Sequence, residues 1–169
     1  STPPSNITNL SVSSCSSASC SLSWTAPGND GNVGTASSYD MRYSTSPIND
    51  FNWTSVTQAT GEPVPTVAGT TQSMNISGLS PTTTYYFAIK SSDGTNVSAL
   101  SNVPTGTTTA VPDTTAPTSL NPNLQAARDA TNQSSQINLS WNAYTDNVGV
   151  AGYRIERCQG VGCSSFIQI

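Results

Sequence analysis

This chain of 169 residues contains no histidine and few charged residues, with five Lys or Arg and nine Asp or Glu. Histidine is the commonest general base near neutral pH and a common metal ligand, so its absence argues against catalysis and against a metal site. The formal net charge is −4 and Lys90 is the only lysine. Without a basic patch to attract phosphate groups, nucleic acid and anionic membranes are not expected partners.

Long apolar runs are absent as well. No stretch approaches the roughly 20 apolar residues of a transmembrane helix, and no signal peptide opens the sequence. The first residue is Ser1 rather than Met, which we interpret as the start of a processed or excised segment. Ser and Thr fill 52 positions, while 34% of the residues are apolar and recur in short alternating runs. This composition predicts a β protein with a hydroxyl-rich surface.

The four cysteines form two pairs with the same spacing, Cys15 with Cys20 and Cys158 with Cys163. In each pair four small or flexible residues intervene, which suits a tight hairpin whose flanking residues face each other. A metal site is the weaker interpretation, because zinc sites favour closer cysteines and would need His or further Cys nearby. We expect two local disulfides, no metal, and an oxidising location, extracellular or on the cell surface.

Short apolar stretches of period two, separated by turns rich in Gly, Asn, Asp and Pro, indicate seven strands in the first part of the chain. Tyr85, Phe87 and Ile89, for example, point to one face of such a strand. Sustained helical periodicity occurs nowhere. The strands are expected near residues 7–12, 20–24, 39–43, 51–56, 74–79, 85–90 and 100–107. The pattern predicts an all-β, antiparallel sandwich.

The sequence around Trp24 recurs around Trp141, with an offset of 141 − 24 = 117 residues. Each Leu-Ser-Trp strand is followed by a loop with Asp, Asn and Gly and then by a tyrosine, Tyr39 in the first copy and Tyr153 in the second. The sequence ends 16 residues after Tyr153 (169 − 153), which is too few for the remaining strands. We therefore predict a complete sandwich at 1–109, an extended linker at 110–116 and a partial second sandwich at 117–169.

Several spaced anchors resemble the fibronectin type III family, particularly its bacterial secreted members. They are Trp24, Tyr39, Tyr43 and the run from Gly78 to Ile89, which includes Leu79, Pro81 and Tyr85. The resemblance covers residues 3–109 and implies an immunoglobulin-like sandwich in which the Tyr85 hydroxyl bonds back to the preceding turn. Residues from Pro117 onward resemble the first half of a second copy, without a counterpart of Leu79, Tyr85 or the final strand. The core anchors implied are Trp24, Tyr39, Leu79, Tyr85, Trp141 and Tyr153.

Candidate ligand sites all have a structural alternative. The Asp30–Gly34 segment has oxygen-bearing side chains at alternate positions, as calcium loops do, but it lacks a closing glutamate and suits a turn equally well. We favour the turn. Phe51, Trp53 and Tyr86 fit either a sugar-binding or partner surface or strand packing, and we favour packing. No nucleophile has a histidine beside it, so we expect neither catalytic residues nor a cofactor.

Covalent glycans are a further open hypothesis, on asparagine or on Ser/Thr clusters such as residues 107–109. Chance accounts for most of the Asn-x-Ser/Thr sequons in so Ser- and Thr-rich a chain. The sequons start at Asn6, Asn9, Asn52, Asn75, Asn96, Asn132 and Asn138.

A half sandwich would expose Leu139, Trp141, Tyr153 and Ile155, so these residues are expected to form an assembly interface. Either copies of this chain or further domains of the same polypeptide would cover them. The favoured hypothesis is a non-catalytic extracellular structural protein, a segment or subunit of a tandem array or self-assembling fibre. The alternative is a spacer or a glycan-binding or adhesion module from a larger secreted protein that carries a carbohydrate-active enzyme.

Overall fold

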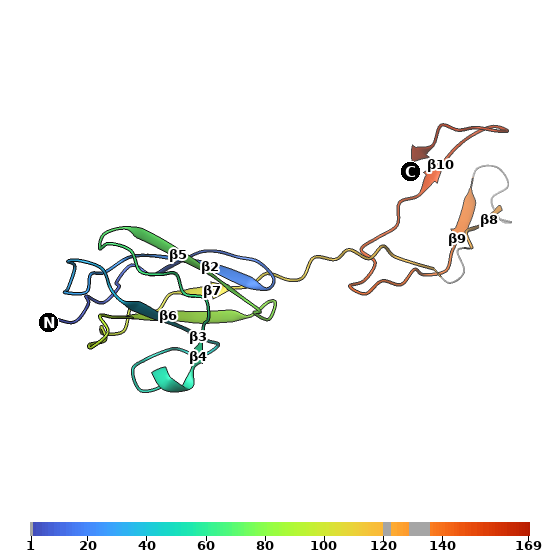
Figure 1. Ribbon diagram of the computed structural model, residues 1–169. Helices are drawn as coiled ribbons and strands as arrows, with labels where there is room; N and C mark the ends of the chain where they lie inside the picture. Colours follow the sequence, from blue (N-terminus) through green and yellow to red (C-terminus); the bar gives the residue numbers. More distant parts are fainter. Residues whose placement is uncertain (1, 120–122, 129–135) are drawn as a thin grey trace. The chain divides into compact units, whose positions relative to one another are not determined.

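The computed structural model (Figure 1) describes residues 2–119, 123–128 and 136–169. The chain divides into two units, unit 1 at Ser1–Pro112 and unit 2 at Asp113–Ile169. In the described part of the chain the regular elements are strands, apart from the 3-10 helix η1 at Trp53–Ser55. No described helix is long and apolar enough to cross a membrane.

Unit 1 contains two antiparallel sheets, with strand orders β1-β2-β5 and β4-β3-β6-β7. The strands are β1 (Ser11–Cys15), β2 (Ser19–Thr25), β3 (Ser38–Ser44), β4 (Thr57–Gln58), β5 (Thr71–Ser77), β6 (Thr84–Ser92) and β7 (Thr105–Thr107). Residues from both sheets meet in one apolar cluster. The predicted seven-stranded antiparallel sandwich is therefore confirmed.

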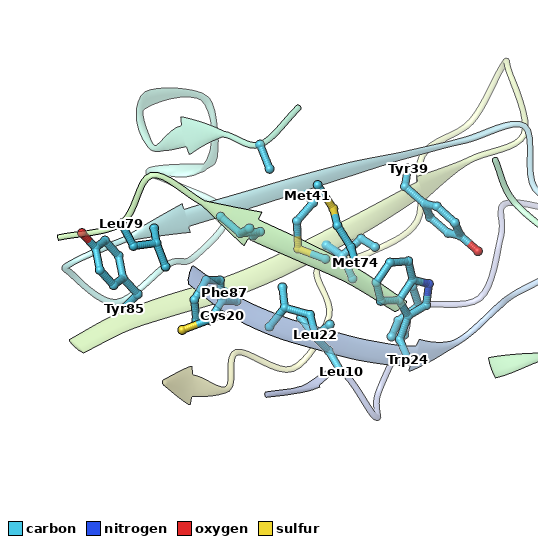
Figure 2. Packing of buried hydrophobic residues seen from close by; sticks show 14 residues of the cluster. Leu10, Cys20, Leu22, Trp24, Tyr39, Met41, Met74, Leu79, Tyr85 and Phe87 are labelled. Atoms are coloured by element: carbon cyan, nitrogen blue, oxygen red, sulfur yellow. The ribbon is translucent and has the colours of Figure 1, made fainter. Parts of the chain in front are cut away.

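Side chains that alternate along the strands build this core (Figure 2). In β2 the even-numbered positions from Cys20 to Trp24 are buried, while the serines between them are half-buried. Met41 of β3 and Phe87 of β6 have no exposed surface. The cluster consists of Ile7, Leu10, Cys20, Leu22, Trp24, Tyr39, Met41, Ala59, Met74, Ile76, Leu79, Tyr85, Phe87 and Ile89. Removal of this apolar surface from water provides the main driving force for folding of unit 1.

The predicted strand at residues 51–56 is wrong. Trp53–Ser55 forms η1, and only Thr57–Gln58 pairs as β4. The Ser55 and Val56 amides donate to the Asn52 carbonyl at 3.0 and 3.2 Å, so the backbone curls instead of extending. Trp53 is buried in a second cluster with Ile48 and Ala88, separate from the main core.

The first and last strands of unit 1 are shorter than predicted. The first begins at Ser11, because the Asn102 side chain binds both the amide and the carbonyl of Leu10, at 2.9 and 2.8 Å. Leu10 therefore lies against the segment that leads to β7 rather than pairing with β2. The last strand comprises only Thr105–Thr107.

Unit 2 contains two antiparallel pairs, β8 (Gln125–Arg128) with β9 (Ile137–Ser140) and β10 (Glu156–Arg157) with β11 (Ile167–Gln168). Tyr153 matches Tyr39 of β3 in the sequence repeat, but the nearest strand of unit 2, β10, begins only at Glu156. Among the residues of unit 2 that the structure describes, none is buried. Its apolar side chains therefore retain contact with solvent, unlike those of unit 1.

Candidate functional site

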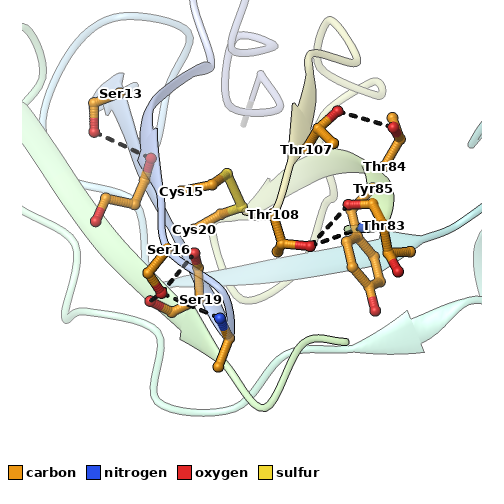
Figure 3. Close-up of a disulfide and its surroundings, with 12 residues drawn as sticks. Ser13, Cys15, Ser16, Ser19, Cys20, Thr83, Thr84, Tyr85, Thr107 and Thr108 are labelled. Atoms are coloured by element: carbon orange, nitrogen blue, oxygen red, sulfur yellow. Dashed lines mark hydrogen bonds between the residues drawn. A yellow bond between two sulfur atoms is a disulfide. The ribbon is translucent and has the colours of Figure 1, made fainter. Parts of the chain in front are cut away.

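A disulfide joins Cys15 to Cys20 and closes the β1–β2 hairpin (Figure 3). The two residues are register partners with their Cα atoms 4.1 Å apart, and the Ser16 amide donates to the Ser19 carbonyl at 2.8 Å within the turn. A Cβ at Gly106 of β7 would meet the Cys15 Sγ at 2.9 Å, so glycine lets β7 pass close to the bridge. Cys158 and Cys163 are also joined, with Cα atoms 6.1 Å apart. Both predicted disulfides are present.

The Thr108 side chain fastens the end of unit 1 to the turn that precedes β6 (Figure 3). Its hydroxyl donates to the Ser80 carbonyl at 2.6 Å and accepts from the Thr83 amide at 2.9 Å. Only 2% of Thr108 is exposed. Because this hydroxyl is buried and bonded, it is not accessible for glycosylation in the folded unit, whereas Thr107 and Thr109 are exposed.

Tyr85 fixes the other side of the same turn. Its hydroxyl accepts from the Ser80 amide at 3.0 Å, which is the contact that the family resemblance implies for a corner tyrosine. Leu79 and Tyr85 are both buried in the main core. Ser80 is therefore held through its N–H by Tyr85 and through its C=O by Thr108.

Trp24 and Tyr39 pack edge to face in the core of unit 1, with ring centroids 5.3 Å apart. They come from opposite sheets, and both are buried. The Tyr39 hydroxyl donates to Gln72 Oε1 at 2.6 Å. Burial raises the pKa of the Tyr39 phenol, and the Trp24 indole N–H acts in the opposite direction. The Tyr39 hydroxyl is therefore satisfied, whereas the buried Trp24 Nε1 has no hydrogen-bond partner among the described residues. The pair is an element of the core.

The equivalent pair in unit 2, Trp141 and Tyr153, has the same centroid separation of 5.3 Å. Here, however, 37% of Trp141 and 46% of Tyr153 is exposed. The Tyr153 hydroxyl accepts from the Tyr144 amide at 2.9 Å. A cavity of about 430 Å³ opens at this pair, and Leu124 and Ile155 also line it. Leu139, the fourth residue predicted at an assembly interface, is half-buried and does not line this cavity.

The three aromatic residues predicted to pack or to form a partner surface lie in different surroundings. Trp53 is 8% exposed, and the Arg42 guanidinium and the Lys90 ammonium lie 5.1 and 4.9 Å from the centroid of its ring system. Tyr86 is half-buried against the same cluster. Phe51 is completely exposed. The packing interpretation therefore describes Trp53 and Tyr86 but not Phe51.

The Asp30–Gly34 segment is a tight turn. Asp30 and Val33 exchange backbone hydrogen bonds at 3.1 and 3.2 Å, and the Thr2 amide donates to Asp30 Oδ1 at 3.1 Å. Gly31 and Gly34 have positive φ angles of 61° and 78°, which suits glycine. Within residues 2–119, 123–128 and 136–169, no group of three His, Cys, Asp or Glu side chains is placed to hold a metal ion.

A family model described as "Fibronectin type III domain" matches residues 2–107, more than half of the chain. The chain belongs to the fibronectin type III family. The match covers nearly the whole of unit 1, which is therefore a fibronectin type III domain and, as such, non-catalytic. Thr108 lies one residue beyond the match, within a run of three threonines. Nothing in that run distinguishes its buried member, so the sequence analysis did not identify the bonds of the Thr108 hydroxyl.

Two bacterial enzymes contain similar sequences. Chitinase A1 of Niallia circulans is 50% identical over 92 residues, which is 53% of this chain and 12% of that protein. Exoglucanase B of Cellulomonas fimi is 29% identical over 161 residues, which is 92% of this chain and 12% of that protein. The chain thus spans about an eighth of the length of each relative. A solution structure of the fibronectin type III domain of human fibronectin type III domain containing protein 3 is 19% identical, with a TM-score of 0.47, and covers 64% of this chain and 89% of that one.

Proposed function

We propose that this chain is a non-catalytic tandem module of an extracellular carbohydrate-active protein, in which it acts as a spacer between other domains. The similarity to exoglucanase B is the observation that carries this proposal. A match over 92% of 169 residues omits at most 8%, or about 14 residues, so it extends into unit 2 at least to about residue 155. The shared region is therefore the two-unit segment and not unit 1 alone.

The chemistry of the segment agrees with this role. Both disulfides are stable in an oxidising, extracellular environment. Residues 109–118, between β7 and the first described bridge of unit 2 at Thr118, are all exposed and include Pro112 and Pro117. Proline restricts the backbone, so this segment is stiffer than a Gly/Ser linker of the same length, as suits a spacer.

Capture from the organism that encodes the chain tests the proposal. An antibody against unit 1 should precipitate, from culture supernatant, a polypeptide far larger than 17.5 kDa that hydrolyses chitin or a β-glucan. Beads with a non-immune antibody provide the control. Recovery of a polypeptide of about 17.5 kDa without hydrolase activity would contradict the proposal.

A second candidate function is self-assembly through unit 2, and the exposure of Trp141 and Tyr153 favours it. Copies of the chain would then cover this pair, as strands of unit 1 cover Trp24 and Tyr39. Light scattering of the purified chain should show a mass that rises with concentration, and Trp141→Ser should reduce that rise. Val161→Ser is a suitable control, because Val161 is equally apolar, fully exposed and does not line the cavity. A monomer at every concentration excludes this candidate.

A further inference from the structure

Phe51 is the one aromatic residue of the fibronectin type III unit whose ring does not pack against other residues. Its exposure is 101%, whereas the nearby Trp53 is 8% exposed. Single exposed apolar residues are common on protein surfaces and need no special explanation. What sets Phe51 apart is that the loop around it, residues 47–55, is held in place by several specific contacts.

Two asparagine side chains fix the backbone on either side of Phe51. Asn49 Oδ1 accepts from the Phe51 and Asn52 amides, at 2.9 and 3.1 Å. Asn52 Oδ1 accepts from the Asn49 amide at 2.8 Å, and its Nδ2 donates to the Pro47 carbonyl at 2.9 Å. These four bonds replace the regular pairing that the loop lacks and reduce its conformational freedom.

An ion pair, a hydrogen bond and burial of Trp53 anchor the base of the same loop. Lys90 Nζ lies 2.7 Å from Asp50 Oδ1, next to Phe51 in the sequence, and 4.9 Å from the Trp53 ring centroid. Arg42 Nη1 donates to the Trp53 carbonyl at 2.8 Å. The residues on both sides of Phe51 are thus tied to β3 and β6. The phenyl ring is consequently presented to solvent by an ordered backbone, with little entropy left to lose when it is contacted.

The residues that flank Phe51 in the sequence indicate what kind of partner the ring fits. Asn49, Thr54 and Ser55 are exposed and carry amide and hydroxyl groups, and the Asp50 charge is compensated by Lys90. One face of a pyranose ring presents C–H groups that stack on an aromatic ring, while its hydroxyls need donors and acceptors at the edge. A protein contact would instead favour further apolar side chains around the aromatic anchor.

We propose that Phe51 is the stacking platform of a contact with a neutral polysaccharide, with Asn49 as the positioning residue that holds the platform. This inference rests on the proposed function, in which the chain belongs to a carbohydrate-active protein. It adds to the spacer role a weak direct contact with the polysaccharide, made by the loop at residues 47–55 of unit 1.

Depletion by insoluble powder tests the contact with the full 169-residue chain. The chain is mixed with powdered chitin or with microcrystalline cellulose, and the unbound protein is measured over a range of concentrations. Phe51→Ala should weaken apparent binding about five- to tenfold, the size expected for loss of one aromatic contact. Val64→Ala is the matched control, because Val64 is also an exposed apolar residue of unit 1, at 84%, and binding should not change.

Two further measurements separate this role from an effect on folding. Phe51→Ala should leave the melting temperature unchanged, because the ring has no surface buried in the unit. Asn49→Ala keeps the ring but frees its backbone, and binding should weaken by a smaller factor. Phe51→Tyr, which keeps the aromatic face, should bind like the wild type.

The inference is overturned if the wild-type chain binds neither powder, or if Phe51→Ala binds as well as wild type. If Phe51 contacts another domain of the same polypeptide and not the polysaccharide powder, the choice of partner is wrong. The antibody capture described above does not depend on Phe51. A captured hydrolase together with a chain that does not bind would therefore refute this inference alone and leave the proposed function standing.

Discussion

Replacement of Thr108 by valine should destabilise unit 1 although the change preserves shape. Valine fills nearly the same volume but cannot donate to the Ser80 carbonyl or accept from the Thr83 amide. The backbone bond from the Thr108 amide to the Thr83 carbonyl, at 3.0 Å, would remain. The hydroxyl also lies within donating distance of the Thr83 carbonyl, at 3.1 Å, and that group keeps the Thr108 amide as a donor. The change therefore isolates the hydrogen bonds that the hydroxyl makes.

The size of the effect follows from the two groups left without a partner. A buried donor or acceptor without a partner costs about 1–3 kcal/mol, and since Thr83 is half-buried and Ser80 is exposed, water can partly compensate for both. We therefore expect a loss of about 1–2 kcal/mol in the free energy of unfolding, which corresponds to roughly 5–10 °C in melting temperature for a unit of this size. Thr107→Val is the matched control. Thr107 is exposed, and its hydroxyl bonds only to the Thr84 hydroxyl. Thr107→Val should therefore lower the free energy of unfolding by less than about 0.5 kcal/mol.

Urea unfolding of the single and double variants provides the assay. Tyr85→Phe removes the acceptor of the Ser80 amide, and it should cost about 1 kcal/mol. Both variants loosen the peptide groups of Ser80, so the double variant should cost less than the sum, by about 0.5 kcal/mol or more. If Thr108→Val is no less stable than Thr107→Val, the turn is not held as described and the reasoning is refuted.

Three other predictions concern pH, oxidation and exposure. Because burial raises the pKa of Tyr39, the folded unit holds the phenol proton more tightly than the unfolded chain does, and this stabilisation is present below about pH 10 and is lost as the pH rises through the folded pKa. The difference in unfolding free energy between the wild type and Tyr39→Phe should therefore narrow between about pH 8 and 11. Urea midpoints of the two proteins that stay parallel over this range would contradict the prediction. Replacement of both Cys15 and Cys20 by serine should lower the free energy of unfolding by about 2 kcal/mol, as expected for so short a loop, and unit 1 should remain folded. Loss of the near-ultraviolet circular dichroism of unit 1 at 25 °C would contradict this prediction. Acrylamide should quench the fluorescence of Trp141 far more than that of the two buried tryptophans. Trp141→Phe should therefore remove most of the fluorescence that acrylamide can quench. If the quenched fraction is the same in the wild type and in Trp141→Phe, Trp141 is covered in solution.

The sandwich was predictable because its main signal is local. Alternation along β2 and β6 has a period of two residues, and a period of two places every second side chain on the same face of the strand whatever the distant sequence. The disulfides were predictable for a similar reason, since the cysteines of each pair are only five positions apart in the sequence. The ends of the strands were not predictable from the local sequence, because residues from elsewhere in the chain determine them. Asn102, 92 positions away, is the residue that keeps Leu10 out of β1.

The aromatic loop shows how a local pattern can mislead. Phe51 and Trp53 stand two residues apart, as in a strand with one apolar face, yet one is fully exposed and the other is buried. The asparagines at positions 49 and 52 bind nearby backbone groups and turn the chain, so side chains two residues apart no longer share a face. Sequence reasoning had identified both aromatic residues but could not assign them different environments.

The two Trp–Tyr pairs separate what the local sequence determines from what distant strands add. Both pairs have centroids 5.3 Å apart, so the aromatic contact forms in each unit. In unit 1 the tyrosine hydroxyl donates to Gln72 of β5, whereas in unit 2 Tyr153 accepts from the amide of Tyr144, only nine positions away. Burial therefore depends on strands like β5 and β6, whose alternate apolar side chains close the core over Trp24. Burial of Trp141 to the same degree would require strands with a similar alternation of apolar side chains, because the described strands of unit 2 include no buried residue.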